Sequence, residues 1–144
     1  MKGDPLPGKD HISRYCAPKT APDGQPTGAS FMPKKGEDMP RKGEEFLSVN
    51  WMEHFGEIGQ KAQIAKIREH IELSLARNGL FAVLNVGKVI DHIHRVGEKK
   101  LAILHEPTQG DPSHSGVHGY QHEDLLVAEL IAEIVMEIYP SKQT

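Results

Sequence analysis

The residues best suited to chemistry are concentrated between positions 101 and 120, with the sequence LAILHEPTQGDPSHSGVHGY. A short apolar run there ends at His105, and a connection rich in Pro and Gly follows, carrying His114, Ser115 and His118. The chain has nine histidines in 144 residues, and histidine is the side chain that exchanges its proton near neutral pH. We therefore expect a functional site in this segment first.

One hypothesis is a metal site made of histidines. Three imidazoles with a water molecule form a catalytic zinc shell, and the ligands would be His105, His114 and His118. Against this hypothesis, the residues between the last two histidines do not favour a helix, and pairs at this spacing arise by chance in a chain rich in histidine. We expect no cofactor, and we keep zinc as the alternative.

A second hypothesis is acid–base or phosphoester chemistry. His11-Ile12-Ser13 resembles one half of a two-histidine phosphoesterase motif, and no second copy is present. A more general set would combine a histidine base, a hydroxyl group and an arginine that binds an anion. The candidates for that set are His11, Ser13, Arg14, His105, His114 and Ser115. They can act together only if residues 11–16 lie against the 105–120 loop.

In the simplest interpretation, these side chains have only structural roles. Histidine and serine in a loop can satisfy the backbone through hydrogen bonds, and residues 11–16 can anchor the start of the chain to the core. Cys16 is the only cysteine, which excludes an internal disulfide. A lone cysteine is usually a small buried hydrophobe, so we do not expect it to be a nucleophile.

Composition excludes several classes of function. A chain of 144 residues suits one domain, and a net charge of −3 gives no broad attraction to nucleic acid or anionic membranes. No apolar run approaches the roughly 18–20 residues of a membrane span, and the N-terminal MKGDPLPGKD lacks the apolar stretch of a signal peptide. We expect a cytoplasmic protein that has a protein partner and does not bind nucleic acid as its main partner.

The predicted fold class is α+β in a single domain. Residues 1–45 hold seven Pro and six Gly, which predicts a long irregular arm that wraps the core or is partly disordered. The core, residues 46–144, should form a small, mostly antiparallel sheet with helices on one face. Its strands are expected at 46–55, 80–96 and 100–105, and its helices at 57–78 and 123–139.

Three local predictions are less direct. The apolar residues of 87–96 fit both the helical period and the alternation of a strand. We favour a strand because residues 97–100 would then form a hairpin turn. Residues 106–119 are predicted as a long loop, which is often functional. Residues 29–32 are predicted as a short strand between Gly28 and Pro33.

Three short strings, LSVNW at 47–51, FAVLNVG at 81–87 and SHSG at 113–116, resemble small uncharacterised bacterial proteins. These are associated with defence, as CRISPR accessory proteins, so the resemblance implies an antiviral setting. We therefore expect a bacterial accessory protein that binds a protein partner or ligand through the arm and the 105–120 loop. The alternative is a hydrolase or transferase for a phosphate-bearing or nucleotide substrate that uses His11, His105 and His114.

Overall fold

The computed structural model describes residues 2–33 and 46–142, and it confirms the α+β class. Within these residues, six strands form one antiparallel sheet in the order β4-β5-β2-β1-β3-β6. The strands are β1 (His11–Cys16), β2 (Leu47–Trp51), β3 (Leu80–Asn85), β4 (Ala102–His105), β5 (His114–His118) and β6 (Glu137–Pro140). The residues at 34–45 that were assigned to the arm lie outside the described part.

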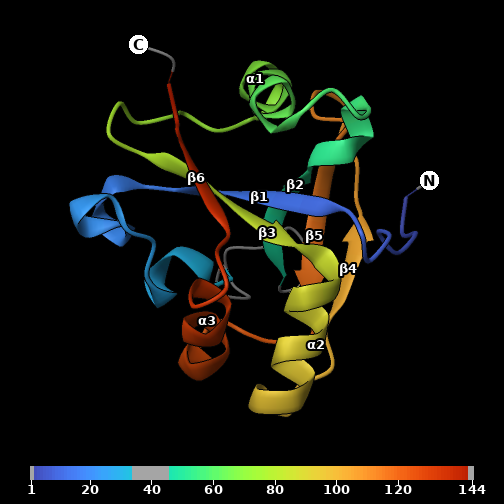
Figure 1. Cartoon of the computed structure of the whole chain (residues 1–144), viewed down its shortest axis with the longest axis vertical. Helices are drawn as coiled ribbons and strands as arrows, with labels where there is room; N and C mark the ends of the chain where they lie inside the picture. The colour runs from blue at the N-terminus through green and yellow to red at the C-terminus, as the bar shows by residue number, and fades with distance from the viewer. Residues whose placement is uncertain (1, 34–45, 143–144) are drawn as a thin grey trace.

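Three α-helices in the described residues cover both faces of the sheet (Figure 1). They are α1 (Gln60–His70), α2 (Val86–Gly97) and α3 (Leu125–Ala132). The helices were expected on one face, but α1 lies across the sheet from α2 and α3. The segments around Leu75 and Ile134, predicted as helix, fall outside α1 and α3. None of the described helices is long and apolar enough to cross a membrane.

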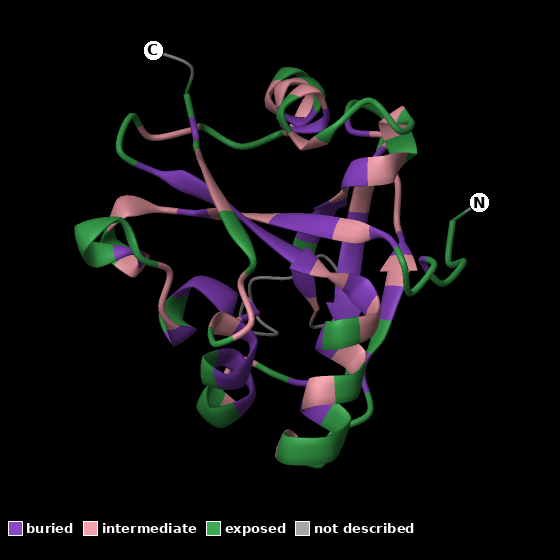
Figure 2. Cartoon of the chain, in the orientation of Figure 1, coloured by how far each residue is buried: buried purple, intermediate pink, exposed green. Residues whose placement is uncertain are grey.

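The two faces of the sheet have separate hydrophobic clusters because side chains alternate along β3. Phe81 and Val83 pack with Ile64 and Ile67 of α1 on one face. Leu80, Ala82 and Leu84 point the other way, into the larger cluster that includes α2 and α3. A run of apolar residues fills β3 because both of its faces are buried (Figure 2).

The strand predicted to extend to residue 96 is wrong after Asn85. The chain turns there into α2, and the Asn85 Oδ1 accepts a hydrogen bond from the Lys88 N–H at 2.9 Å. This side chain caps the helix. Val86, Val89 and Ile93 then face the core at helical spacing, so the helical period was the correct one of the two. The expected hairpin turn is absent, since Glu98 ends α2 in the left-handed conformation with φ 56°.

The C-terminal helix predicted at 123–139 is also shorter than expected. α3 ends at Ala132, and the chain returns to the sheet as β6 beside β3. The Met136 N–H donates to the Val83 carbonyl at 2.9 Å, just before the paired residues. Pairing with the exposed edge of β3 therefore replaces the last helical turns.

The start of the chain contributes more to the sheet than an outer arm would. β1 lies between β2 and β3, and the Leu6 N–H donates to Ile103 at the outer edge of β4. The irregular character is confirmed further along, where three short 3₁₀ helices include Gly28–Phe31 in place of the strand expected at 29–32. The last residues of the strand predicted at 46–55 instead form the 3₁₀ helix Met52–Phe55.

Candidate functional site

Two adjoining cavities open on the sheet where β1, β2 and β5 meet. The first, called the polar cavity here, has a volume of about 200 Å³. Its polar lining comes from β1, β2, β5, the connection between β4 and β5, and the segment that follows α1. These side chains are Arg14, Ser48, Asn50, Glu72, Thr108, Asp111 and His114, and the Thr108 hydroxyl donates to Glu72.

Arg14 lies where β1 and β2 stop pairing. Their ladder has only the pairs Ile12–Trp51 and Ser13–Asn50, and beyond it the Arg14 guanidinium fills the gap. Nε donates to the Ser30 carbonyl at 2.8 Å and Nη1 to the Ser48 carbonyl at 2.9 Å. Within the described residues these are its only hydrogen bonds, so three of the five N–H groups are open to a ligand.

The charge of Arg14 is kept in a largely apolar setting. Burial lowers the pKa of Arg14, while Cys16 and Tyr120 act in the opposite direction. The guanidinium of arginine is not deprotonated in proteins. The polar cavity therefore has a fixed positive charge on one wall.

His114 is held through one ring nitrogen, and the other has no hydrogen bond to the described residues. It lies opposite Asn50 in the pairing of β5 with β2, and its Nδ1 is 2.8 Å from the Glu106 carbonyl oxygen. Since a carbonyl can only accept, Nδ1 must carry the proton, and this assigns the tautomer. The neutral ring then has a lone pair on Nε2 that can accept a proton or a hydrogen bond.

A buried polar network forms the floor of the polar cavity. Asn50 Nδ2 lies 3.0 and 2.9 Å from the two carboxylate oxygens of Asp111 and 2.9 Å from the Ser113 Oγ. Asn50 is 4% exposed and Asp111 is 2% exposed. Neutral donors therefore hold a buried carboxylate in a fixed position, because a charge without partners would be costly here.

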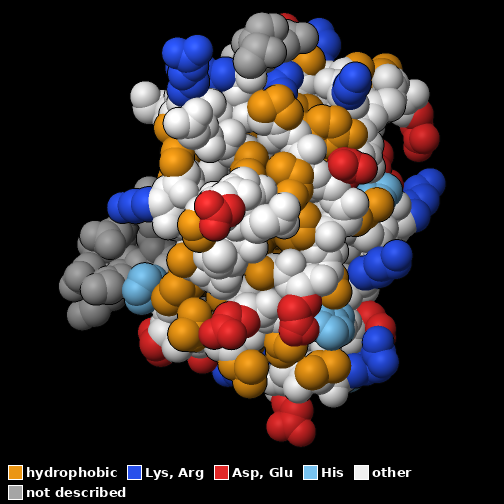
Figure 3. All heavy atoms as spheres, turned by 60° about the vertical axis from the view of Figure 1, so that its left-hand side comes forward, with side chains coloured by type: hydrophobic (Ala, Val, Ile, Leu, Met, Phe, Trp, Pro, Cys, Tyr) orange, Lys and Arg blue, Asp and Glu red, His pale blue; other side chains and the backbone are white. Residues whose placement is uncertain are grey.

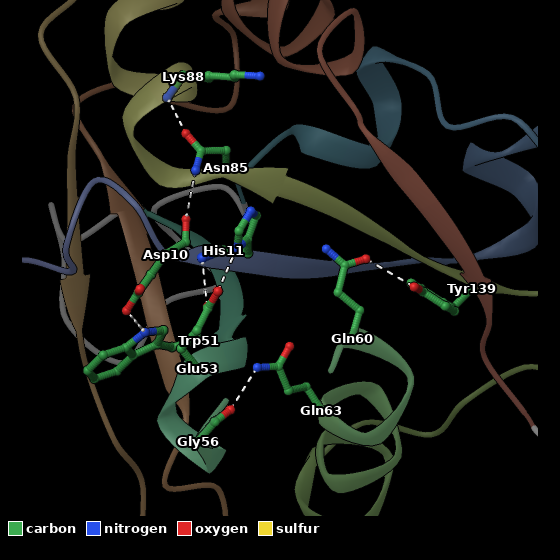
Figure 4. A network of polar contacts seen from close by, with 10 residues as sticks. All are labelled: Asp10, His11, Trp51, Glu53, Gly56, Gln60, Gln63, Asn85, Lys88 and Tyr139. Carbon is green, nitrogen blue, oxygen red and sulfur yellow. Dashed lines mark hydrogen bonds and ion pairs between the residues drawn. The ribbon is translucent and has the colours of Figure 1, made fainter. Parts of the chain in front are cut away.

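The predicted catalytic residues on β1 do not all face the same site. Arg14 enters the polar cavity, but His11 turns toward Glu53, with Nδ1 2.5 Å from Oε2 (Figure 4). The His11 backbone N–H donates to the same carboxylate at 2.7 Å. Ser13 is buried beside Asn50, and its Oγ has no partner in the described structure. Of these three, only Arg14 lines the two adjoining cavities.

His105 lies on the other face of the sheet from His114. It pairs with Ser115 in the register of β4 with β5, and neighbouring residues of a strand point to opposite faces. Its ring contacts Trp51 and His54, with centroids 5.1 and 5.5 Å apart. Burial, followed by the charge of His105, lowers the pKa of His54. Ser115 is buried on that face too and donates to the Ser113 carbonyl at 3.1 Å.

The structure does not bring the predicted zinc ligands together. His114 and His118 share a face, but His105 is on the opposite one. His118 pairs with Glu106 and stacks on Phe46, with ring centroids 4.8 Å apart. In residues 2–33 and 46–142, no three His, Cys, Asp or Glu side chains are grouped for a metal ion.

Ser48, Asn50 and Asp111 line the polar cavity but were not predicted as site residues. A signal for two of them exists in LSVNW, where Ser48 and Asn50 alternate with apolar residues and so occupy one face of β2. Asp111 lies between candidate histidines, but its contact with Asn50 joins residues 61 positions apart. No local pattern reports such a contact.

No family model, curated protein sequence or solved structure matches this chain. The geometry of the polar cavity is therefore the basis for any functional argument.

Proposed function

We propose that the protein binds a small phosphate-bearing ligand in the polar cavity. The observation that supports this most is that Arg14, from the N-terminal segment, and His114, from the 105–120 segment, line the same cavity. Of the binding surface that the sequence predicted on the arm and the 105–120 loop, the proposed site keeps these two side chains and the polar network between them.

The chemistry of the lining favours a phosphate ester over a simple carboxylate. Arg14 offers open N–H groups, whose geometry suits phosphate oxygens. His114 Nε2 and the carboxylates of Asp111 and Glu72 are acceptors, so the ligand must also donate hydrogens. A phosphate monoester has a second pKa near 6, and a sugar phosphate has hydroxyl groups as well. Such a ligand has both the acceptors and the donors that these walls require.

Inorganic phosphate is the first probe, and NMR spectra of the untagged, ¹⁵N-labelled full chain provide the measurement. We expect saturable shifts of the Arg14 Nε and of the His114 and Asn50 amides. Arg14→Lys should weaken binding at least about tenfold, and Arg95→Lys, on the exposed side of α2, should not change it. A lack of saturable shifts at about 10 mM phosphate, where a 1 mM Kd gives about nine-tenths occupancy, would reject the proposal.

A second candidate function is hydrolysis or transfer of the phosphoryl group. The Nδ1–carbonyl contact of His114 supports it, because it orients Nε2 as a base. Nε2 would take a proton from water while the water oxygen bonds to phosphorus and the ester oxygen leaves, protonated by solvent. The expected trio of His11, His105 and His114 is replaced by His114 with Arg14. Turnover of 4-nitrophenyl phosphate that is lost in His114→Gln would favour this function, and a lack of turnover would favour binding.

We also propose that the protein works with a protein partner in bacterial defence, in the cytoplasm. The resemblance of the three short strings supports the setting. Exposed apolar side chains support a partner: Leu125 is 48% and Leu126 is 64% exposed on α3. Hydrophobic and acidic side chains are interspersed on the side that includes α3 and β6 (Figure 3). Coexpression with the products of neighbouring genes, followed by size-exclusion chromatography with Leu126→Glu as a control, tests this proposal.

A further inference from the structure

A second cavity, called the apolar cavity here, adjoins the polar cavity. Its volume is about 190 Å³, and it shares Arg14, Tyr15, Ser48 and Leu73 with the polar cavity. The two cavities therefore meet at these four residues, with Arg14 in the lining of both.

The rest of this lining is mostly apolar: Ala17, Ala29, Met32, Pro33, Phe46 and Leu47. The two hydroxyl groups of this lining that the polar cavity does not share already have acceptors. Thr20 Oγ1 donates to the Ala17 carbonyl at 2.8 Å, and Ser30 Oγ donates to the Thr20 carbonyl at 2.9 Å. An apolar group of a ligand is thus the natural occupant of this cavity.

Phe46 gives the apolar cavity an aromatic wall in a defined orientation. Its ring stacks on His118 at an interplanar angle of 29°, and Glu106 holds His118 through a hydrogen bond to Nε2. Gly116 lies under this group, and a Cβ there would lie 2.6 Å from the Phe46 Cδ1. A ring fixed in this way can stack with a flat base, since every nucleobase has a π-face.

We propose that the two cavities form one binding site for a nucleoside monophosphate. The base occupies the apolar cavity against Phe46, and the phosphate and sugar hydroxyl groups occupy the polar cavity. The sugar, which joins the base to the phosphate, spans the junction of the cavities. Arg14, which lines both cavities, binds the phosphate on the polar side, and Asp111 and His114 accept hydrogen bonds from the hydroxyl groups. This inference rests on the proposed function and specifies the ligand class for the same site.

The test compares AMP, ribose 5-phosphate and inorganic phosphate on the full chain by the NMR titration described above. Because only AMP has a base to stack, we expect it to bind at least about tenfold more tightly than ribose 5-phosphate. Ala17→Leu, which fills the apolar cavity, and Phe46→Leu, which removes the aromatic ring, should each abolish this difference and leave phosphate binding unchanged. Ala102→Leu, at an exposed position of β4 outside both cavities, is the matched control.

The possible failures can be told apart. Equal affinities for AMP and ribose 5-phosphate would overturn the base subsite and leave phosphate binding in place. An AMP preference that survives both cavity variants would overturn its location in the apolar cavity. If none of the three probes binds, the proposed function fails together with this inference.

Discussion

Arg14 Nη1 donates a hydrogen bond to the carbonyl oxygen of Ser48 at 2.9 Å, at the place where the ladder between β1 and β2 ends. A side chain thus satisfies a backbone acceptor that the neighbouring strand leaves open. The same guanidinium also donates to Ser30, which precedes Phe31 in the core. Arg14 therefore joins two strands and a 3₁₀ helix while it lines both cavities.

Arg14→Lys should reduce stability as well as ligand binding. Lysine keeps the charge but lacks the planar fork that reaches the Ser30 and Ser48 carbonyls together. We expect a loss of about 1–3 kcal/mol in the free energy of unfolding, measured in urea. Arg95→Lys, in an ion pair where both side chains are more than 60% exposed, should change it by less than about 0.5 kcal/mol. Equal losses in the two variants would contradict the structural role of Arg14.

The contact between Asn50 and Asp111 can be measured with a double-mutant cycle. Asn50→Leu leaves the buried Asp111 carboxylate without its amide donor, so we expect a loss of about 2–4 kcal/mol. Asp111→Asn removes the charge and should cost less. In the double variant no charge remains to be solvated, so its loss should be smaller than the sum by about 1–2 kcal/mol. Additivity of the two changes would show that the residues do not interact.

The sequence predicted correctly those elements whose pattern of apolar residues follows from their own burial. β2 and β3 follow from the alternation in LSVNW and the apolar run at 80–85. Long-range pairing decided the others. β5 contains Gly116, and β6 continues an apolar helical pattern, so each becomes a strand only because a neighbouring edge is open.

The candidate site was predicted in part for the same reason. The expected approach of residues 11–16 to the 105–120 segment occurs at Arg14 and His114. His114 faces the cavity through the register of β5 with β2, and His105 faces away through the register of β4 with β5, so a shift of one residue in either pairing would turn that histidine to the other face. Register is set by pairing partners across the sheet and is not encoded in the spacing of histidines.

Gly116 is predicted to be essential for the packing around Phe46. A Cβ at this position would lie 2.5 Å from the Glu106 Oε2 and 2.6 Å from the Phe46 Cδ1. Gly116→Ala should therefore destabilise the fold by about 1–3 kcal/mol and displace the Phe46 ring from His118. Gly8→Ala is the control, because its Cβ would make only an ordinary contact at 3.7 Å. Urea unfolding and the ring NMR signals of Phe46 test both variants, and an unchanged Gly116→Ala protein would contradict this packing.

Tyr120 should make the fold sensitive to alkaline pH. The side chain is buried, donates its hydroxyl proton to the Phe31 carbonyl, and has a pKa raised by burial, with Arg14 opposing the shift and Asp124 adding to it. Because the folded state favours the neutral phenol, its stabilisation is complete below the unfolded pKa of about 10 and falls as the pH rises through that value. One proton accounts for at most about 1.4 kcal/mol per pH unit.

Tyr120→Phe provides the control for this pH dependence. The variant should be less stable at pH 8 by about 1–2 kcal/mol, since the Phe31 carbonyl loses its donor. Above pH 10 the stability of the native protein should fall toward that of the variant, because only the native protein has this proton to lose. Cys16, whose pKa burial also raises, is present in both proteins, so its contribution cancels in the difference. Urea unfolding curves at pH 8.0, 9.5 and 10.5 give the comparison, and a constant difference across this range would show that the Tyr120 phenol ionises as easily when folded as when unfolded.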